Sequence, residues 1–187
     1  MNAPTPAPMI DKTYRKRYNR TVYYYCTTRG GLMLYYEIYD TEIGKILIAE
    51  DGQAITNLCV EGSLNVSDAR RGETALLKQT AAALHAYLAG EKDAFAGLPL
   101  NPKGTPFQKQ VWQALLEIPY GQTISYMQLA RNINNPKAVR AVGAANGKNP
   151  IFVIIPCHRV IGADGKLTGF AYGLELKRRL LDLEGGG

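Results

Sequence analysis

The chain has 187 residues, of which 46% are hydrophobic and 20% are charged, and its formal net charge is +6. This length and composition are typical of a globular protein with one large or two small domains. The sequence has no run of about 18 uncharged apolar residues and no apolar signal-peptide core at its N-terminus, so we expect no membrane span and no secretion. Its three cysteines lack paired spacing, which argues against a disulfide framework and favours a reducing compartment, the cytoplasm.

Charge is distributed unevenly along the chain. The net charge is +5 over residues 1–32 (six bases, one acid), −5 over 33–101 (five and ten) and +6 over 102–187 (eleven and five). Such sign reversals favour separate units, and we place domain boundaries at these points. The basic C-terminal unit suits a polyanionic partner such as nucleic acid, although a solvated basic surface explains the same charge.

The N-terminal half has the pattern of a small sheet followed by one helix. Residues 1–32 are rich in proline, basic residues and tyrosine, and we expect a disordered extension, although such a segment could also bind nucleic acid by stacking and charge. Met33 precedes the first strand and is an alternative start of the functional chain. Three β-favouring runs within 34–60 predict an antiparallel meander. Apolar spacing over 72–90 predicts a helix that ends at Gly90.

The C-terminal half is predicted to be mostly helical. It follows a linker rich in Pro and Gly, and Thr105 and Pro106 are typical of an N-cap and a first helical position. Two short helices are then expected within 125–133 and 136–148. Their lengths and tight connection match a helix-turn-helix.

The second of these helices carries unusually little side-chain bulk. Its small residues are Ala138, Ala141, Gly143, Ala144, Ala145 and Gly147. Glycine costs about 1 kcal/mol relative to alanine inside a helix, so a close approach to another surface is expected to compensate. That surface is either a neighbouring helix or a nucleic-acid groove. Arg140 is the one long side chain in the middle of the lean stretch.

The stretch FVIIPCHRVIG, residues 152–162, places Cys157 beside His158. Adjacent residues do not face each other along a helix or a strand, so a direct hydrogen bond between the two side chains is awkward. A relay through one water is easier, and it needs a third group to orient the imidazole. A cation or hydrogen-bond donors nearby would lower the thiol pKa from about 8.5. Taken alone, the pair favours an inert buried cysteine, the commoner situation, over a nucleophile.

The wider sequence resembles the O6-alkylguanine-DNA alkyltransferases, also called methylated-DNA–protein-cysteine methyltransferases. The resemblance is carried without a gap from about residue 104 to 185 by GTPFQKQVWQALLEIPYGQTISYMQLA and AVRAVGAANGKNPIFVIIPCHRVIGADGKLTGFAYGLELKRRLLDLEG, with IPCHRV as its anchor. It implies an α+β fold. A small ribonuclease H-like domain with a three-stranded antiparallel sheet is expected over 33–101, and a mostly helical, winged-helix-like domain with the helix-turn-helix over 102–187.

The resemblance also implies DNA repair by direct damage reversal. An alkyl group on O6 of guanine, or on O4 of thymine, would move irreversibly and once per molecule to Cys157 after the nucleotide is flipped out. His158 matches the water-mediated base, and Glu184 matches the carboxylate that orients it. Asn149 matches a hinge that braces the turn before the active-site strand, and Tyr126 a tyrosine whose hydroxyl serves the leaving guanine. No cofactor is implied.

The same resemblance implies a DNA-binding surface on double-stranded DNA, with the lean helix in the minor groove and the protein acting as a monomer. Arg140 matches a finger that enters the base stack and fills the gap left by the flipped nucleotide. The residues expected to contact DNA are Arg140, Tyr126, Ala138, Ala141, Gly143, Ala144 and Arg159.

The pocket for the alkylated base is expected to be lined by Val160, Phe170, Tyr172 and Gly173. Tyr172 stands where glycine is common in the family, so we expect a narrower pocket that favours methyl over benzyl groups. The Cys/His set of the structural zinc in some members is absent, and no metal is predicted.

Three other classes of function were weighed. A non-catalytic lesion-binding protein would not need Cys157, His158 and Glu184 together. A helix-turn-helix DNA-binding regulator with Cys157 as a sensor would be expected to carry a longer effector domain. A cysteine hydrolase would need an oxyanion loop before Cys157, and no such loop is recognisable.

Overall fold

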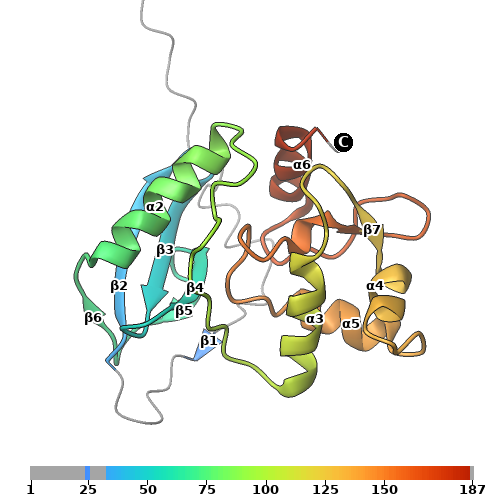
Figure 1. Cartoon of the computed structure of the whole chain (residues 1–187), viewed down its shortest axis with the longest axis horizontal. Coiled ribbons are helices and arrows are strands. Elements are labelled where there is room, and N and C mark those ends of the chain that lie inside the picture. The colour runs from blue at the N-terminus through green and yellow to red at the C-terminus, as the bar shows by residue number, and fades with distance from the viewer. Residues whose placement is uncertain (1–23, 26–32, 186–187) are drawn as a thin grey trace, which may run out of the picture.

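The computed structural model describes residues 24–25 and 33–185, and it has two parts that lie side by side (Figure 1). The N-terminal part is a sheet covered by one helix, and the C-terminal part is mostly helical. The strands are β1 (Tyr24–Tyr25), β2 (Tyr35–Thr41), β3 (Gly44–Glu50), β4 (Ile55–Val60), β5 (Leu64–Asn65), β6 (Arg70–Arg71), β7 (Ile124–Ser125) and β8 (Val160–Ile161). The helices are α2 (Ala75–Leu88), α3 (Pro106–Leu116), α4 (Tyr126–Asn132), α5 (Val139–Asn146), the 3₁₀ helix η1 (Cys157–Arg159) and α6 (Leu174–Leu183).

The predicted meander is present as β2, β3 and β4, which pair antiparallel. The sheet has four strands rather than three, in the order β4-β3-β2-β6, because the two-residue β6 adds to the β2 edge in parallel. β6 lies in a polar stretch without alternating apolar residues, which is why the pattern did not predict it. Within the 1–32 extension, β1 pairs with β5, and the rest of that segment lies outside the described residues.

The helix α2 covers one face of this sheet (Figure 1). The Thr74 hydroxyl accepts from the Leu77 amide and caps its first turn. Its buried side chains are Leu77, Thr80, Ala81, Leu84 and Tyr87. The buried stripe therefore includes a tyrosine near the end of the helix.

The C-terminal part begins with the predicted capping of α3: Thr105 and Gln108 form a reciprocal capping box around Pro106. Trp112 of this helix is buried, and its indole N–H donates to the carbonyl of Ala145 in α5 at 2.9 Å. The helices α4 and α5 form the predicted helix-turn-helix, and α3 packs against both.

The apolar run before Cys157 joins the two parts. It lies along the β4 edge, where the Leu58 amide donates to the Pro150 carbonyl at 2.9 Å and the Phe152 amide to the Leu58 carbonyl at 3.1 Å. One continuous cluster of buried apolar side chains extends from β3 and β4 through this run into α3, α5 and α6. Among the residues that the structure describes, no helix is long and apolar enough to cross a membrane.

Candidate active site

Cys157 opens η1 at the end of the apolar run, and it is 4% exposed. The turn that delivers it is fixed by Asn149, whose Nδ2 donates to the Ile155 carbonyl at 2.7 Å and whose Oδ1 accepts from the Ile151 amide at 3.0 Å. Val153 in this turn has φ of 72°, a conformation that β-branched residues rarely adopt. The expected active-site strand is therefore a tight turn followed by a short 3₁₀ helix.

His158, the residue after Cys157, forms a buried pair with Glu184. The His158 Nε2 lies 2.9 Å from Glu184 Oε1, and both side chains have no solvent exposure. Because a carboxylate only accepts, Nε2 carries the ring proton and Nδ1 is left as the acceptor. His158 Nδ1 is buried and has no hydrogen-bond partner among the described residues, so it is the atom available to take a proton from the thiol side.

The carboxylate of Glu184, at the end of α6, accepts from four residues. Oε1 accepts from His158 Nε2 at 2.9 Å, from Arg159 Nη2 at 2.9 Å and from the Tyr87 hydroxyl at 2.6 Å. Oε2 accepts from Arg159 Nε at 2.9 Å and from the Gly121 amide at 3.2 Å. Burial by itself would raise the pKa of this carboxyl, but the hydrogen bonds from His158 and Arg159 hold it well below its usual range. Glu184 is therefore ionised at neutral pH.

The same burial acts on the thiol and the imidazole. It raises the pKa of the Cys157 thiol to about 11, against the opposing effects of the Asn149 amide and the Lys177 charge. It also lowers the pKa of His158, against the opposing effect of Glu184. The resting site consequently holds a thiol, a neutral imidazole and a carboxylate, which is the arrangement a base-assisted nucleophile needs.

Lys177 is a buried cation that the sequence interpretation missed. Its Nζ donates to the carbonyls of Val160 at 2.5 Å and Thr168 at 2.7 Å, which ties the loop after β8 to the body of the domain. Burial lowers the pKa of Lys177 to about 8, and the nearby Cys157 opposes this shift. A sequence signal for Lys177 does exist. The buried side chains of α6 and its C-cap recur with helical spacing, at positions 176, 177, 180, 181 and 184, and this spacing places Lys177 on the inner face of the helix.

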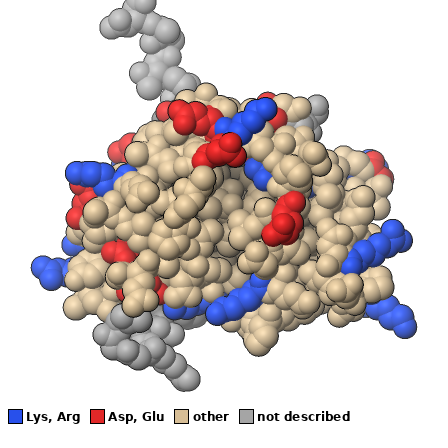
Figure 2. Space-filling model, viewed as in Figure 1, with Lys and Arg blue, Asp and Glu red and all other residues tan. Residues whose placement is uncertain are grey.

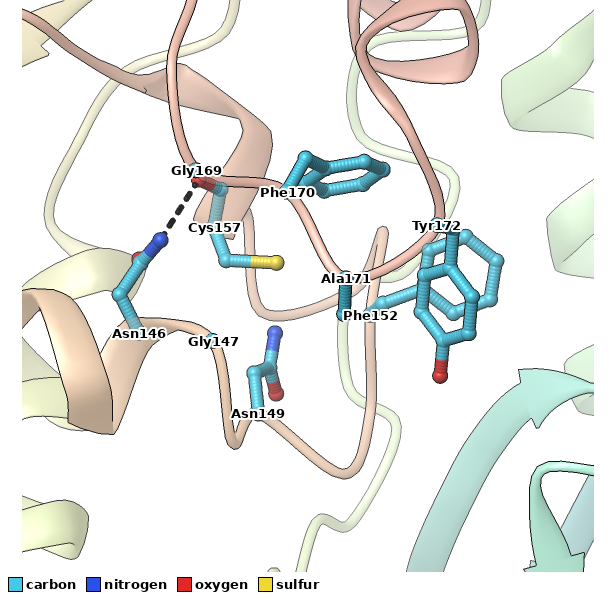
Figure 3. Close-up of a pocket in the computed structure, with 9 residues that line it drawn as sticks. All are labelled: Asn146, Gly147, Asn149, Phe152, Cys157, Gly169, Phe170, Ala171 and Tyr172. Atoms are coloured by element: carbon cyan, nitrogen blue, oxygen red, sulfur yellow. Dashed lines mark hydrogen bonds between the residues drawn. The ribbon is translucent and has the colours of Figure 1, made fainter. Parts of the chain in front are cut away.

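A small pocket opens beside the Cys157 sulfur (Figure 3). Its lining residues are Asn146, Gly147, Asn149, Phe152, Cys157, Gly169, Phe170, Ala171 and Tyr172 (Figure 3). Phe170 and Tyr172 thus line it as expected, whereas Val160 and Gly173 are buried but do not line it. The Tyr172 ring packs on Phe152, with centroids 4.5 Å apart, and Figure 3 shows Ala171 between that ring and the sulfur.

Tyr126 and the loop that contains Thr168 and Gly169 form one side of the site. The Tyr126 hydroxyl lies 3.0 Å from the Gly169 carbonyl and 3.2 Å from the Thr168 carbonyl. Gly169 has φ of +58°, and a Cβ there would lie 2.8 Å from the same hydroxyl, so the approach requires glycine. A Cβ at Gly143 would make only an ordinary contact of 3.8 Å with the Tyr126 ring.

The lean helix α5 presents its small residues and one cation to solvent. Arg140, Ala141 and Ala144 are exposed, and Ala138 and Gly143 are half-buried. Figure 2 shows Lys and Arg side chains projecting from the lower and right-hand edges of the C-terminal part. This is a surface that a polyanion can approach closely.

Arg159 lies elsewhere than predicted. The sequence interpretation placed it among the DNA contacts, but its side chain is 11% exposed and is directed inward at Glu184. Its remaining Nη1 donates to the Ile118 carbonyl at 2.6 Å, and its guanidinium lies 5.7 Å from the Tyr120 ring centroid. With each of its three nitrogens donating inside the protein, Arg159 holds the carboxylate rather than a phosphate.

Family models and known proteins match most of this chain. Residues 34–102 match the ribonuclease-like domain of 6-O-methylguanine DNA methyltransferase, and residues 106–186 match its DNA-binding domain. A methylated-DNA–protein-cysteine methyltransferase of Haemophilus influenzae is 48% identical over 154 residues, which cover 81% of this chain and 86% of that protein. Another, from Methanosarcina acetivorans, is 50% identical over 155 residues, which cover 81% of this chain and 99% of that protein.

Solved structures agree with the sequence comparison. The crystal structure of Mycobacterium tuberculosis OGT in complex with DNA is 44% identical, with a TM-score of 0.75 and with 80% of this chain and 92% of that chain covered. The O6-methylguanine-DNA methyltransferase of Pyrococcus kodakaraensis is 25% identical, with a TM-score of 0.61 and coverage of 82% and 99%. These matches confirm the predicted α+β fold class.

Proposed function

The chain belongs to the methylated-DNA–protein-cysteine methyltransferase family, and we propose that it repairs DNA by moving an alkyl group from O6 of guanine onto its own Cys157. The observation that carries this proposal is the buried arrangement of Cys157, His158 and Glu184 beside a cavity, in a domain that exposes a lean helix. A lesion-binding protein without chemistry would have no use for the buried pair.

In the proposed reaction the Cys157 sulfur attacks the alkyl carbon while the thiol proton passes through one water to His158 Nδ1. A carbon–sulfur bond forms as the carbon–oxygen bond breaks, and the electron pair of that bond stays on the guanine. Glu184 stabilises the imidazolium that results. The Tyr126 hydroxyl, which donates to the Gly169 carbonyl in the free protein, turns from that carbonyl in the proposed reaction and donates a hydrogen bond to the leaving guanine. Because a thioether has no easy leaving route, each molecule reacts once.

An alkylated base inside a duplex cannot reach a buried thiol, so the nucleotide has to be flipped out, at a cost of a few kcal/mol that is smaller for damaged pairs. In this proposal α5 enters the minor groove with its small residues, and Arg140 fills the space left in the stack. The protein acts as a monomer on double-stranded DNA, and O4-alkylthymine is a second substrate. Cys157 has to stay reduced, which the cytoplasm ensures.

We also propose a domain division at residues 33–101 and 102–187, in which the C-terminal domain binds DNA and contains the acceptor Cys157.

A stoichiometry measurement tests the proposal as a whole. Protein is titrated into a fixed amount of duplex that contains O6-methylguanine, and the repaired base is counted. We expect repair to stop at one equivalent per protein; continued turnover, or no repair at any ratio, would refute it.

A further inference from the structure

The last turn of α2 reaches from the N-terminal part into the catalytic pair. Its residue Tyr87 is 1% exposed, and the Tyr87 hydroxyl donates to Glu184 Oε1 at 2.6 Å while lying 3.4 Å from His158 Nε2. Tyr87 and Glu184 are 97 residues apart in the sequence. We propose that Tyr87 is a positioning residue for alkyl transfer, through which the N-terminal part sets the orientation of the Glu184 carboxylate and hence of His158.

This inference rests on the proposed function, and the geometry of the carboxylate carries it. Oε1 has three donors, and the contact from Tyr87 is the shortest of them at 2.6 Å, against 2.9 Å for His158 and for Arg159. A hydrogen bond to an ionised acceptor is about twice as strong as a neutral one, and 2.6 Å is the usual length for a hydroxyl donor to a carboxylate. The donors reach Glu184 from α2, from η1 and from the turn at Gly121, so the carboxylate is held on three sides.

The phenol is itself held in place. Its ring lies against Phe95, with centroids 5.2 Å apart, and edge-on to Tyr120 at 6.1 Å. Burial and the charge of Glu184 both raise the pKa of Tyr87, so the hydroxyl stays protonated and acts as a donor across the pH range in which proteins work. A phenylalanine would keep the ring contacts, so what the hydroxyl adds is its contact with Glu184 and His158.

Removal of the hydroxyl has a defined electrostatic consequence. Glu184 also faces Arg159 and Tyr120, and His158 is also influenced by the charges of Arg159 and Lys177. None of these is altered by Tyr87→Phe, which keeps the ring. The change leaves Oε1 with one donor fewer, so more of the carboxylate charge acts on His158 Nε2 and the imidazolium form is favoured. The pKa of His158 therefore rises, and its imidazole becomes the neutral base only at a higher pH.

The first experiment compares single-turnover transfer from a duplex that contains O6-methylguanine in wild type, Tyr87→Phe and Tyr39→Phe. Tyr39 is a matched control, because it lies in the same part of the chain and its hydroxyl also contacts a carboxylate, that of Glu73 at 3.4 Å, away from the site. We expect Tyr87→Phe to transfer the methyl group more slowly by on the order of tenfold, as removal of an outer hydrogen-bond partner does. We also expect the fall of its transfer rate toward acid to begin at a higher pH than in wild type. Tyr39→Phe should match wild type.

A double-mutant cycle separates positioning from simple stability. If Tyr87 acts through Glu184, Tyr87→Phe should cost little further rate in a Glu184→Gln background. Additive losses would overturn the inference. An active wild type with Tyr87→Phe equal to Tyr39→Phe would also overturn it and would leave the proposed function standing, whereas an inactive wild type would remove both.

A measurement without DNA tests the coupling directly. The chain has only two histidines, and His85 is exposed on α2, so ¹⁵N-labelled imidazole signals can be assigned and titrated in the free protein. We expect the pKa of His158 to be higher in Tyr87→Phe than in wild type, and the His85 signals serve as the internal reference. An unchanged or lower His158 pKa would refute the proposed link.

Discussion

Glu184→Gln is the substitution whose effect the structure defines best. A carboxylate accepts at both oxygens, but an amide has one acceptor and one NH₂ group that only donates. Three donors meet Oε1 and two meet Oε2. In the better orientation the amide oxygen takes the Oε1 position, and the NH₂ group then faces Arg159 Nε and the Gly121 amide. At least two of the five hydrogen bonds become donor–donor contacts.

The charge is lost together with these bonds. Arg159, with a side chain that is 11% exposed, would keep its cation next to a neutral group. Removal of one partner from a buried ion pair costs about 3 to 5 kcal/mol. For a chain of this size 1 kcal/mol corresponds to about 2 to 4 °C in Tm. We therefore expect Tm to fall by about 6 to 20 °C, and transfer to slow by about tenfold to a hundredfold because His158 is less well oriented.

The pH dependence gives this prediction its sharpest test. The pKa of the Glu184 carboxyl in the folded protein lies below its ordinary value of 4.5, so its stabilising effect is complete above that value and is lost as the pH falls toward the folded pKa. Denaturant unfolding of wild type and Glu184→Gln should show a large, constant gap near neutral pH that narrows under acid. A gap that does not narrow, or equal stability at neutral pH, would refute the reasoning.

Other predictions follow from the same geometry. Arg140→Ala should slow duplex repair more than reaction with the free modified base, since only the duplex needs the stack filled; equal losses in the two assays would make Arg140 structural. Gly169→Ala should slow transfer because its Cβ meets the Tyr126 hydroxyl at 2.8 Å, whereas Gly165→Ala, also at positive φ but with nothing within 4 Å, should keep the wild-type rate; equal rates for the two variants would contradict this. O6-benzylguanine should inactivate the protein slowly, and Tyr172→Ala should speed inactivation while methyl transfer stays active; rapid inactivation of wild type would show that Tyr172 does not restrict the cavity.

The sequence predicted the fold where the periodicity of apolar residues determines it. The meander of β2–β4, the helix α2 and the pair α4 and α5 all follow from short-range patterns and caps. The strand β6 has two arginines, and its pairing depends on the β2 edge, which lies more than thirty residues earlier. Long-range pairing of a polar dipeptide leaves no local signal, so this strand could not be predicted.

The site was predictable only in part for the same reason. Cys157 and His158 stand out as neighbours, but the partnership of His158 with Glu184 came from the resemblance, because no local pattern links residues 26 positions apart. Tyr87 has a weaker signal: it lies one helical turn after Leu84, and a buried tyrosine needs a partner for its hydroxyl. Arg159 was expected among the DNA contacts, and only the fold shows that Glu184 lies within its reach.

The most direct test of the account is the mass of the protein after reaction. Wild type and Cys157→Ser are incubated with a duplex that contains O6-methylguanine, and intact mass is followed by peptide mapping. We predict that wild type gains the mass of one CH₂ group, located on the peptide that contains Cys157, and that Cys157→Ser binds the duplex but gains nothing, because phosphate contacts rather than the thiol carry affinity. A methyl group on Cys59 or on any residue other than Cys157, or repair without a change in mass, would contradict the account.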